Sequence, residues 1–494
     1  MTHVLLRFDA GARIGGGHAS RCLNLADALR AAGARCTIAT VEESLRAFPR
    51  LAGAGHAIVT LPEARDLRAL TGPFDMAVVD HYGLGPDDEA ELRSHARFLV
   101  AIDDLVRPHP QADAVIDQTY RREPTHYEGC LPAQARRFVG AGFCMIHPAF
   151  GAARAQSSVR GGALERIVVS FGATDPGNAT GLTLRALEKF AAASGEAPAV
   201  DVVLGALSPH RAEVESALAR SPLTVRLHVD ASPEALARLY RDADLAIGAG
   251  GISSLERCCV GVPAIAVELN DNQTHVIAAL VGAGAVVGAG PVDALDADAL
   301  ADRIGAIVQG DRASISRASF AVCDGDGVMR AAFALCGVAR HAPYLRRMTM
   351  QDAEVTFHWQ TAPGLRRHFR NSSLPSWKEH VAYIQAALAN SAISLNVIVS
   401  ANDEPTGILR LDRSATDETE VSILIAPESQ GLGFARAALR QASLLRPHDR
   451  LRAWIAPDNL ASLALFRSAG YVEQFDNWFV RAPGPIPVSS GAAR

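Results

Sequence analysis

The chain has 494 residues and a mass of 52.2 kDa, a length typical of about three domains. Hydrophobic residues make up 49% of it, which is enough for packed cores. The formal net charge of -5 gives no basic surface of the kind that nucleic-acid-binding proteins need, so nucleic acid is excluded as an expected partner.

The cysteines and the apolar runs indicate the cellular compartment of the protein. Eight cysteines are scattered along the chain and only Cys258 and Cys259 are adjacent, without a C-x-x-C pair or a Cys/His metal spacing. We therefore expect a reducing compartment and no metal. No basic segment followed by an apolar one begins the chain, and the longest uncharged apolar run, Val276–Val292, is too short to span a bilayer. We expect a cytoplasmic protein with no membrane partner.

A glycine-rich turn near the N-terminus is the first candidate site. Val4–Phe8 is short, apolar and typical of a strand, and apolar residues at helical spacing continue up to Gly33. Between strand and helix, Asp9–His18 ends in three glycines and one titratable side chain. Backbone N–H groups at such a helix start face an incoming ligand. His18 is predicted to act in catalysis or contact the ligand; the alternative is an incidental surface histidine.

Strand-like runs alternate with helical stretches up to about residue 340, which predicts parallel sheets with crossover helices. The strands expected first are Cys36–Val41, Ala57–Leu61, Met76–Asp80 and Phe98–Asp103. The small, polar segment Ala152–Gly162 is typical of a linker. The strands expected after it are Arg166–Phe171, Asp201–Leu204, Thr224–Val229, Asp244–Gly248 and Pro263–Val267. Two Rossmann-like halves predict a ligand held between them.

The second half contains another strand–turn–helix of the same kind, Asp244–Glu256. Its turn and helix start are formed by Gly248, Gly250, Gly251, Ser253 and Ser254. The glycines let a diphosphate approach the backbone, and the serines can cap the helix and donate to phosphate oxygen. Glu256 can accept hydrogen bonds from ribose hydroxyls; the alternative is that it complements the helix dipole.

Three more loops follow predicted strands: Ser170–Asp175, which precedes Asn178; Asn270–Gln273; and Asp80–Gly83. Each alone is compatible with ordinary turn chemistry. Ligands of open α/β sheets bind at the carboxyl ends of the strands, so these loops are expected to converge on one site.

From Tyr344 the pattern changes to a mixed segment. Its expected strands are Ile408–Leu411, Glu420–Ile425 and Leu451–Ile455, and its expected helices include Arg436–Leu445 and Ala461–Ser468. The strand ending at Ile425 leads into a Gln-Gly-x-Gly-x-Ala turn at 430–435, whose free N–H groups suit a pyrophosphate. A tight connection without a ligand is the alternative. The tail Pro483–Arg494 is predicted to be disordered.

Residues 1–340 resemble the glycosyltransferase-B (GT-B) fold of the MurG-like group. Within it they resemble the UDP-2,4-diacetamido-2,4,6-trideoxy-β-L-altropyranose hydrolases of pseudaminic acid biosynthesis. The matching segments are Arg7-x-Asp9, Ile14-Gly-x-Gly-His18-x-x-Arg21-Cys22, Val79-Asp-His-Tyr82, Ile102-Asp-Asp104, Ser170-Phe-Gly-x-x-Asp175, Gly250-Gly-x-x-Ser254-x-Glu256-Arg257 and Asn272-Gln273.

The resemblance implies hydrolysis of the bond between the anomeric carbon and UDP, with inversion and without metal. It implies that His18 orients or deprotonates the water, that Asn272 shares the water or a sugar N-acetyl group, and that Tyr82 contacts the sugar. The residues expected to bind the UDP-sugar are Gly17, Arg21, Gly172, Gly250, Gly251, Ser253, Ser254, Glu256 and Gln273.

Residues 344–482 resemble the GNAT superfamily of acetyl-CoA-dependent N-acetyltransferases. The residues expected to bind acetyl-CoA are Ile423, Ile425, Gln430, Gly431, Gly433, Phe434, Ala435, Asn459 and Ser462. The piece from His358 to His380 resembles the branch that acetylates the 4-amino group of a UDP-linked aminosugar. Many relatives have a tyrosine acid where this chain has Phe466, so Tyr471 or a water is the expected substitute. Glu420 is the candidate base, or else a solvated strand residue.

The expected architecture is α/β, with two Rossmann-like domains in a GT-B arrangement, 1–155 and 156–340. A mixed α+β GNAT domain, 341–482, and a tail, 483–494, follow. The expected function is acetylation of a UDP-4-amino sugar with acetyl-CoA as co-substrate, then hydrolysis of the product to UDP and free sugar. The alternatives are a GT-B glycosyltransferase fused to an acetyltransferase, because fold does not fix function, or a non-catalytic protein that binds UDP-sugars.

Overall fold

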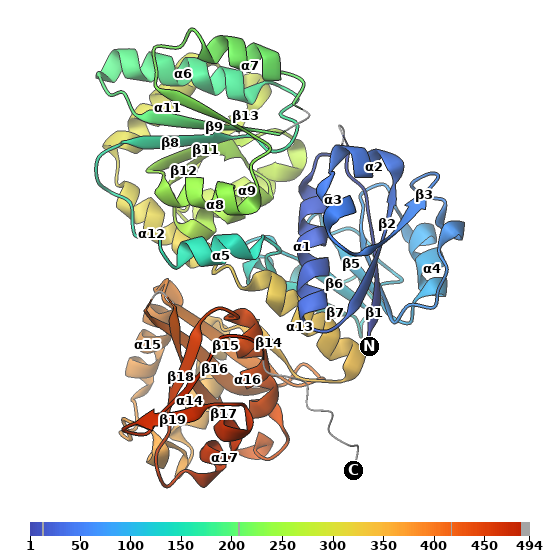
Figure 1. Cartoon of the computed structure of the whole chain (residues 1–494), viewed down its shortest axis with the longest axis vertical. Coiled ribbons are helices and arrows are strands. Elements are labelled where there is room, and N and C mark those ends of the chain that lie inside the picture. Colours follow the sequence, from blue (N-terminus) through green and yellow to red (C-terminus); the bar gives the residue numbers. More distant parts are fainter. Residues whose placement is uncertain (12–13, 206–207, 416, 486–494) are drawn as a thin grey trace. The chain divides into compact units, whose positions relative to one another are not determined.

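A computed structural model describes residues 1–11, 14–205, 208–415 and 417–485. The chain divides into two compact units, Met1–Val328 and Met329–Arg494 (Figure 1). Most of the tail predicted to be disordered lies outside the described residues. No helix in the described ranges is long and apolar enough to cross a membrane.

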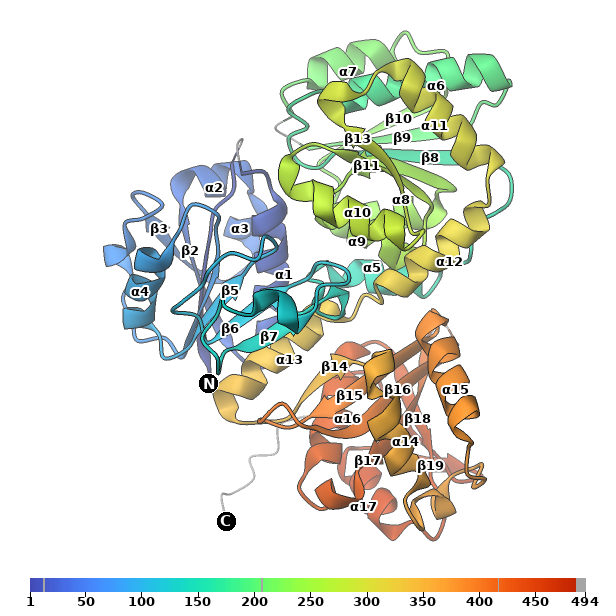
Figure 2. The same ribbon diagram turned by 180° about the vertical axis from the view of Figure 1, so that it is seen from behind.

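The first unit begins with a seven-stranded parallel sheet in the order β3-β2-β1-β4-β5-β6-β7. Its strands are β1 (His3–Phe8), β2 (Arg35–Val41), β3 (Ala57–Leu61), β4 (Met76–Asp80), β5 (Leu99–Ile102), β6 (Ala114–Asp117) and β7 (Arg136–Val139). Its helices are α1 (Gly17–Ala31), α2 (Glu42–Ala47), α3 (Arg50–Gly53) and α4 (Pro86–His95), with 3₁₀ turns η1 (Leu67–Ala69), η2 (Pro124–Tyr127) and η3 (Ala141–Phe143). Helices α1 and α4 lie on opposite faces of the sheet (Figures 1 and 2). The central strands are therefore buried on both faces, as their continuous apolar runs predict.

A second parallel sheet of six strands follows in the order β10-β9-β8-β11-β12-β13. Its strands are β8 (Arg166–Ser170), β9 (Ala199–Leu204), β10 (Val225–Val229), β11 (Leu245–Ala249), β12 (Ala264–Glu268) and β13 (Val287–Pro291). Its helices and turns are α5 (Pro148–Arg154), α6 (Ala179–Ser194), α7 (Arg211–Leu218), α8 (Pro233–Asp242), α9 (Ile252–Val260), η4 (Asp271–Gln273), α10 (Thr274–Gly282), η5 (Val292–Ala294), α11 (Ala297–Gln309) and α12 (Arg312–Val322). Two separate cores cover the sheet, one against α6 and α11 and the other against α8, α9 and α10.

The second unit has a seven-stranded mixed sheet in the order β14-β15-β16-β17-β18-β20-β19, in which only the β17–β18 pair is parallel. Its strands are β14 (Tyr344–Arg347), β15 (Ile393–Val399), β16 (Pro405–Ala415), β17 (Glu418–Ile425), β18 (Arg450–Trp454), β19 (Val472–Phe475) and β20 (Trp478–Arg481). Helix α13 (Gly327–Arg340) precedes α14 (Ala353–Thr361), α15 (Trp377–Ala389), α16 (Phe434–Leu445) and α17 (Leu460–Ser468), with η6 (Met350–Asp352), η7 (Leu365–His368) and η8 (Pro427–Ser429).

The strand order reverses once in each parallel sheet, between β1 and β4 in the first and between β8 and β11 in the second. Open α/β sheets bind ligands outside the carboxyl ends of the strands at such a reversal, because the flanking loops turn away from each other there. The loops that follow these four strands include the Gly-rich turns singled out in the sequence, so topology places them at the expected binding positions.

The structure confirms the expected fold class of two parallel, Rossmann-like sheets followed by a mixed sheet. It differs in detail: β6, β7 and β13 were not expected, and the segment predicted as a linker from Ala152 begins as the last turn of α5. That turn is fixed by a tertiary contact, since the buried Arg154 donates to the carbonyls of Cys259 and Cys323. Local composition carries no signal for such a contact.

Candidate active sites

The carboxyl end of β4 and the first turn of α1 form the centre of the site in the first unit. Asp80, the last residue of β4, is fully buried and accepts hydrogen bonds from His18 Nδ1 at 2.6 Å and from Arg21 Nε and Nη2, each at 2.6 Å. Burial alone raises the pKa of Asp80, but Arg21 and His18 outweigh it and hold that pKa well below its usual range. Asp80 is thus a fixed carboxylate that orients the His18 imidazole.

Because a carboxylate only accepts, His18 donates through Nδ1 and leaves Nε2 as the acceptor. Nε2 has no hydrogen-bond partner among the residues that the structure describes. Arg21 was expected to bind UDP, but its guanidinium is engaged by Asp80 and, at 3.0 Å, by Asp104. Arg21 is buried, so its cation needs counter-charges nearby, and Asp80 and Asp104 supply them.

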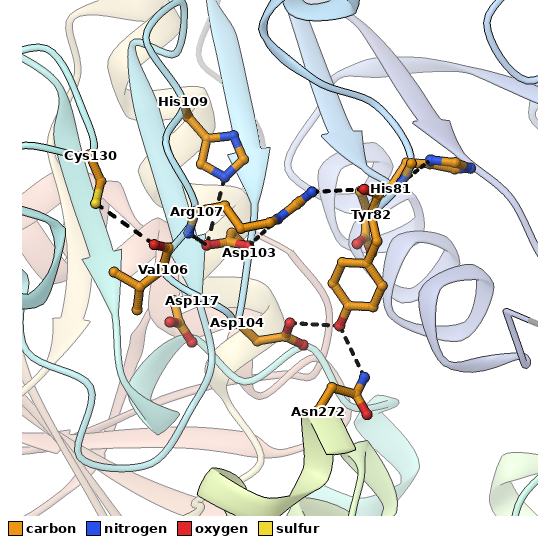
Figure 3. Close-up of polar contacts among 12 residues, drawn as sticks. His81, Tyr82, Asp103, Asp104, Val106, Arg107, His109, Asp117, Cys130 and Asn272 are labelled. Carbon is orange, nitrogen blue, oxygen red and sulfur yellow. Dashed lines mark hydrogen bonds and ion pairs between the residues drawn. The ribbon is translucent and has the colours of Figure 1, made fainter. Parts of the chain in front are cut away.

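Tyr82 connects this centre to the second sheet. Its ring packs edge-on against His18, with centroids 4.7 Å apart and planes at 86°. Its hydroxyl donates to Asp104 Oδ1 at 2.6 Å and accepts from Asn272 Nδ2 at 3.3 Å (Figure 3). Burial and Asp104 raise the pKa of Tyr82, so the phenol stays protonated and cannot act as a base. The structure therefore brings together all three residues expected in catalysis, and Asn272 Oδ1 is buried without a partner beside them.

Arg107 is a neighbour of Tyr82 that the sequence analysis missed. Its Nη1 donates to the Tyr82 carbonyl at 3.0 Å and its guanidinium lies over the Tyr82 ring, 5.3 Å from the centroid (Figure 3). Its Nε donates to Asp103, which His109 also approaches at 3.7 Å. The turn before it places Val106 at φ 58°, a strained conformation for a β-branched residue. No local signal predicts the role of Arg107, because the contact depends on two loops meeting.

Around the second sheet, the loops after β11 and β12 are joined by Gln273. Its Oε1 accepts from the backbone N–H groups of Gly250 and Leu269, each at 3.1 Å. Gly250 leaves room for Ile277, since a Cβ there would lie 2.2 Å from Ile277 Cδ1 and would displace that side chain. Gly251 is the N-cap of α9 and makes no side-chain cap, so the helix start is open as a phosphate site requires.

Two expectations for these loops need correction. The serines do not cap α9: the fully buried Ser254 donates to the Ala249 carbonyl instead, and the helix starts at Ile252, ahead of Ser253. The turn before α6 is not open to phosphate either. Asp175 accepts from the first two N–H groups of that helix and Asn178 from the third, so its free donors are already satisfied. Gly172 before them keeps a positive φ of 85°.

Glu256 lies on α9 and is 8% exposed, without a hydrogen-bond partner in the described part of the chain. Burial raises its pKa to about 7. A buried carboxyl group without a partner is costly, and hydroxyl donors from a ligand are one way to satisfy it. The neighbouring Arg257 is also fully buried, with Nε and Nη1 unpartnered.

The second unit contains a cavity of about 1680 Å³. All nine residues expected to bind acetyl-CoA line it: Ile423, Ile425, Gln430, Gly431, Gly433, Phe434, Ala435, Asn459 and Ser462. Strands β17 and β18 pair only over Glu418–Glu420 and Arg450–Arg452, so the rest of β17 has an unpaired edge along the cavity. Gly431 and Gly433 have φ of 79° and 87°, and α16 starts without a side-chain cap. Backbone donors are thus exposed where a pyrophosphate is expected.

The candidate base and the candidate acid of acetyl transfer differ in their position relative to the cavity. Glu420 lines the cavity and is ion-paired with Arg370, with Arg452 at 3.7 Å. Tyr471 does not line it: it is 2% exposed, and it packs edge-on against Phe466, which does. Burial raises the pKa of Tyr471, and its hydroxyl has no partner. Of this pair, Phe466 lines the cavity and Tyr471 does not, so the role of Tyr471 as the substitute acid stays a prediction that the cavity lining does not support.

Parts of the chain are similar to known proteins. Residues 344–472 match the family described as Acetyltransferase (GNAT) domain. The solved structure of MurG from Acinetobacter baumannii is similar, with a TM-score of 0.47, at 15% identity, covering 67% of this chain and 98% of that one.

Three relatives are similar in sequence. The spore coat polysaccharide biosynthesis protein SpsG of Bacillus subtilis (strain 168) is 25% identical over 345 residues, which are 66% of this chain and 96% of SpsG. The uncharacterized protein MJ1062 of Methanocaldococcus jannaschii is 19% identical over 486 residues, 94% of this chain and 95% of that protein. The UDP-2,4-diacetamido-2,4,6-trideoxy-beta-L-altropyranose hydrolase of Campylobacter jejuni is 26% identical over 151 residues, 30% of this chain and 53% of the hydrolase. The chain thus combines a region of two parallel sheets, similar in sequence to SpsG, with a segment that matches the GNAT acetyltransferase domain family.

Proposed function

We propose that the chain is a bifunctional nucleotide-sugar enzyme. The GNAT domain acetylates the 4-amino group of a UDP-4-amino-4,6-dideoxy-N-acetyl-altrosamine. The first unit then hydrolyses the resulting UDP-2,4-diacetamido-2,4,6-trideoxy-β-L-altropyranose to UDP and free sugar. The name of the Campylobacter jejuni relative supports the second step, and the name of the SpsG relative supports a role in polysaccharide biosynthesis in general.

In the hydrolytic step, water attacks the anomeric carbon on the face opposite UDP. A bond forms from the water oxygen to that carbon, the bond to the UDP oxygen breaks, and the configuration inverts. His18 Nε2 takes the proton of the water, because Asp80 holds Nδ1 as the donor. Tyr82 packs against the imidazole and contacts Asn272 through its hydroxyl, and these two side chains fix the sugar and the water.

The departing UDP carries the negative charge of the broken bond. The open N-terminus of α9 offers backbone donors and the positive end of the helix dipole to the diphosphate. Glu256 on the same helix accepts from the ribose hydroxyls, which gives its unpartnered carboxylate hydrogen-bond donors. These contacts need no metal, since the charge is stabilised by fixed dipoles.

In the acetyl-transfer step, the amine nitrogen of the sugar attacks the thioester carbon, and the bond to sulfur breaks to release CoA. Glu420 receives the amine proton, directly or through a water, from its position in the cavity wall. A water in the cavity protonates the leaving thiolate, since Phe466 has no acidic proton and Tyr471 lies outside the cavity.

One observation supports the hydrolase assignment above all: a histidine held by a buried carboxylate packs against Tyr82, whose hydroxyl contacts Asn272. The test is to incubate the full chain with the UDP-4-amino sugar and acetyl-CoA in ¹⁸O-labelled water, with no acceptor sugar. Stoichiometric UDP, CoA and diacetamido sugar, with the label in the sugar and none in UDP, is the expected result. UDP release only after an acceptor is added indicates a glycosyltransferase, and binding without turnover indicates a regulatory protein.

The His18 assignment is tested in the same assay. His18→Ala should release UDP about 10²–10⁴-fold more slowly while still binding the substrate. The control is His126→Ala, an exposed histidine on η2 that should keep the wild-type rate. Near-normal turnover by His18→Ala removes the base assignment.

A further inference from the structure

The cavity of the second unit has a second wall that the acetyl-CoA residues do not account for. The segment 364–371, which includes η7, contributes Arg366, Arg367 and Arg370 to this wall, together with His368. Glu379 and Glu420 are the carboxylates on the cavity lining, and both are engaged. Glu379 caps α15 through Ser376, and Glu420 pairs with Arg370. His368 Nδ1 contacts the Asp458 carboxylate at 3.2 Å, whereas Arg366 and Arg367 have no carboxylate partner among the described residues.

Arg366 is held in place without a counter-charge. Its Nη1 donates to Gln360 Oε1 at 2.9 Å and its Nη2 to the Asn371 carbonyl at 2.7 Å, and both acceptors are neutral. Its guanidinium lies over the Phe369 ring, 4.8 Å from the centroid, and its Nε has no partner. Burial lowers the pKa of Arg366, as expected for a cation that has lost water without gaining an anion. Each Nη keeps one N–H to donate.

Arg367 is the exposed neighbour of this site. Its Nε donates to His368 Nε2 at 2.8 Å, and no carboxylate pairs with it among the described residues. Two adjacent arginines without carboxylate partners suit a phosphate-bearing ligand, since the planar guanidinium fork matches phosphate oxygens. The pyrophosphate of CoA already has the Gln430–Ala435 turn on the other wall. The two arginines therefore fit a second anionic group.

We propose that Arg366 and Arg367 bind the diphosphate of the sugar acceptor. Arg370, in the same segment 364–371, is ion-paired with Glu420. An acceptor whose diphosphate lies on Arg366 and Arg367 therefore places its sugar amine toward the Glu420 carboxylate. The inference rests on the proposed acetyl transfer and adds the recognition element: the acceptor is recognised as a nucleoside diphosphate derivative, and a free aminosugar is a poor substrate.

The first test does not depend on the identity of the sugar. The full chain is saturated with CoA and treated with phenylglyoxal, with and without inorganic pyrophosphate, and labelled arginines are mapped by peptide mass spectrometry. Arg366 and Arg367 should stay reactive with CoA alone and become at least about fivefold less reactive with pyrophosphate. The exposed Arg467, outside the cavity, is the control. No protection by pyrophosphate, or full protection by CoA alone, overturns the proposal.

The second test is kinetic. The double variant Arg366→Gln/Arg367→Gln should lower kcat/KM for the UDP-linked amine about 100-fold, at about tenfold for each charge-assisted bond lost. The same double variant should change the rate of acetylation of the free aminosugar by less than about twofold, and the KM for acetyl-CoA by less than about twofold. Arg467→Gln is the matched control. Equal losses for both acceptors overturn the proposal. If the wild type acetylates neither acceptor while pyrophosphate still protects the two arginines, the proposed sugar is wrong and the anion site stands.

Discussion

Asp80→Asn is the substitution that tests the site of the first unit most directly. It keeps the volume of the side chain but removes a charge that receives three hydrogen bonds of 2.6 Å from His18 and Arg21. The amide also turns two N–H donors toward groups that themselves donate. Arg21 then keeps one carboxylate, Asp104, at 3.0 Å.

The expected loss follows from burial. Asp80 is fully buried and Arg21 is 5% exposed, so removing one partner leaves a buried cation only partly compensated. Such changes cost about 3–5 kcal/mol of the free energy of unfolding. In urea this lowers the unfolding midpoint of the first unit by about 1–3 M. The pKa of Asp80 is lower in the folded than in the unfolded chain, so its stabilisation is present at neutral pH and lost as the pH falls in acid.

The chain provides an internal control for this experiment. All four tryptophans, at 359, 377, 454 and 478, belong to the second unit. Tryptophan fluorescence therefore follows unfolding of the second unit, whereas far-UV circular dichroism follows both. Asp80→Asn should move the circular dichroism transition and leave the fluorescence transition in place. UDP release should fall about 10²–10⁴-fold because His18 is no longer oriented, with acetyl transfer unchanged.

Asp298→Asn is the matched control, since Asp298 forms an exposed pair with Lys189 at 2.6 Å in the same unit. A pair of this kind contributes at most about 1 kcal/mol. If Asp80→Asn unfolds at the same urea concentration as Asp298→Asn and releases UDP at the wild-type rate, the role assigned to the buried carboxylate is refuted.

Three further predictions concern other parts of the two sites. The pKa of Glu256 is raised to about 7, so the unfolded state loses its proton first and the stability of the first unit should fall between about pH 4.5 and 7. Glu256→Gln should flatten this fall in urea titrations at pH 5 and 8, and an unchanged pH profile contradicts the assigned burial. Gly433→Ala forces an L side chain to φ 87°, a strain of about 1–2 kcal/mol, so the KM for acetyl-CoA should rise about tenfold while UDP release stays the same. A normal KM would show that the turn does not hold the cofactor. Arg107→Leu removes the donor to the Tyr82 carbonyl and the cation over its ring, so kcat for UDP release should fall about tenfold with little change in KM, and Arg107→Lys should restore part of it. Equal loss of binding and turnover in both variants would indicate a folding defect instead.

The sequence predicted the elements that have strong local signals. The strands Ala57–Leu61 and Met76–Asp80 have their predicted bounds. Met76–Asp80 is buried along its whole length, as a continuous apolar run predicts, whereas Ala57–Leu61 lies at the edge of its sheet and is partly exposed. The four-residue strands β6 and β7 were missed, since such short runs do not differ from apolar loop segments. Helix α5 was missed as well, because it depends on contacts of Arg154 with distant carbonyls.

For the sites, the Gly-rich turns predicted roles for His18 and for the turn at 430–435, and the family resemblance predicted roles for Tyr82 and Asn272. Their chemistry and spacing are local properties of the chain. The partners of these residues were not identified. The pairing of Arg21 with Asp80, the position of Arg107 over Tyr82 and the exclusion of Tyr471 from the cavity all join residues from different elements.

The sequence by itself determined the class of each fold and the chemical groups that each site offers, because periodicity and turn composition act over a few neighbouring residues. The tertiary structure decided which carboxylate holds His18, which helix start remains open and which arginines lack a counter-charge. These properties depend on burial and on pairs of residues far apart in the chain, so they arise only when the strand ends and loops are brought together.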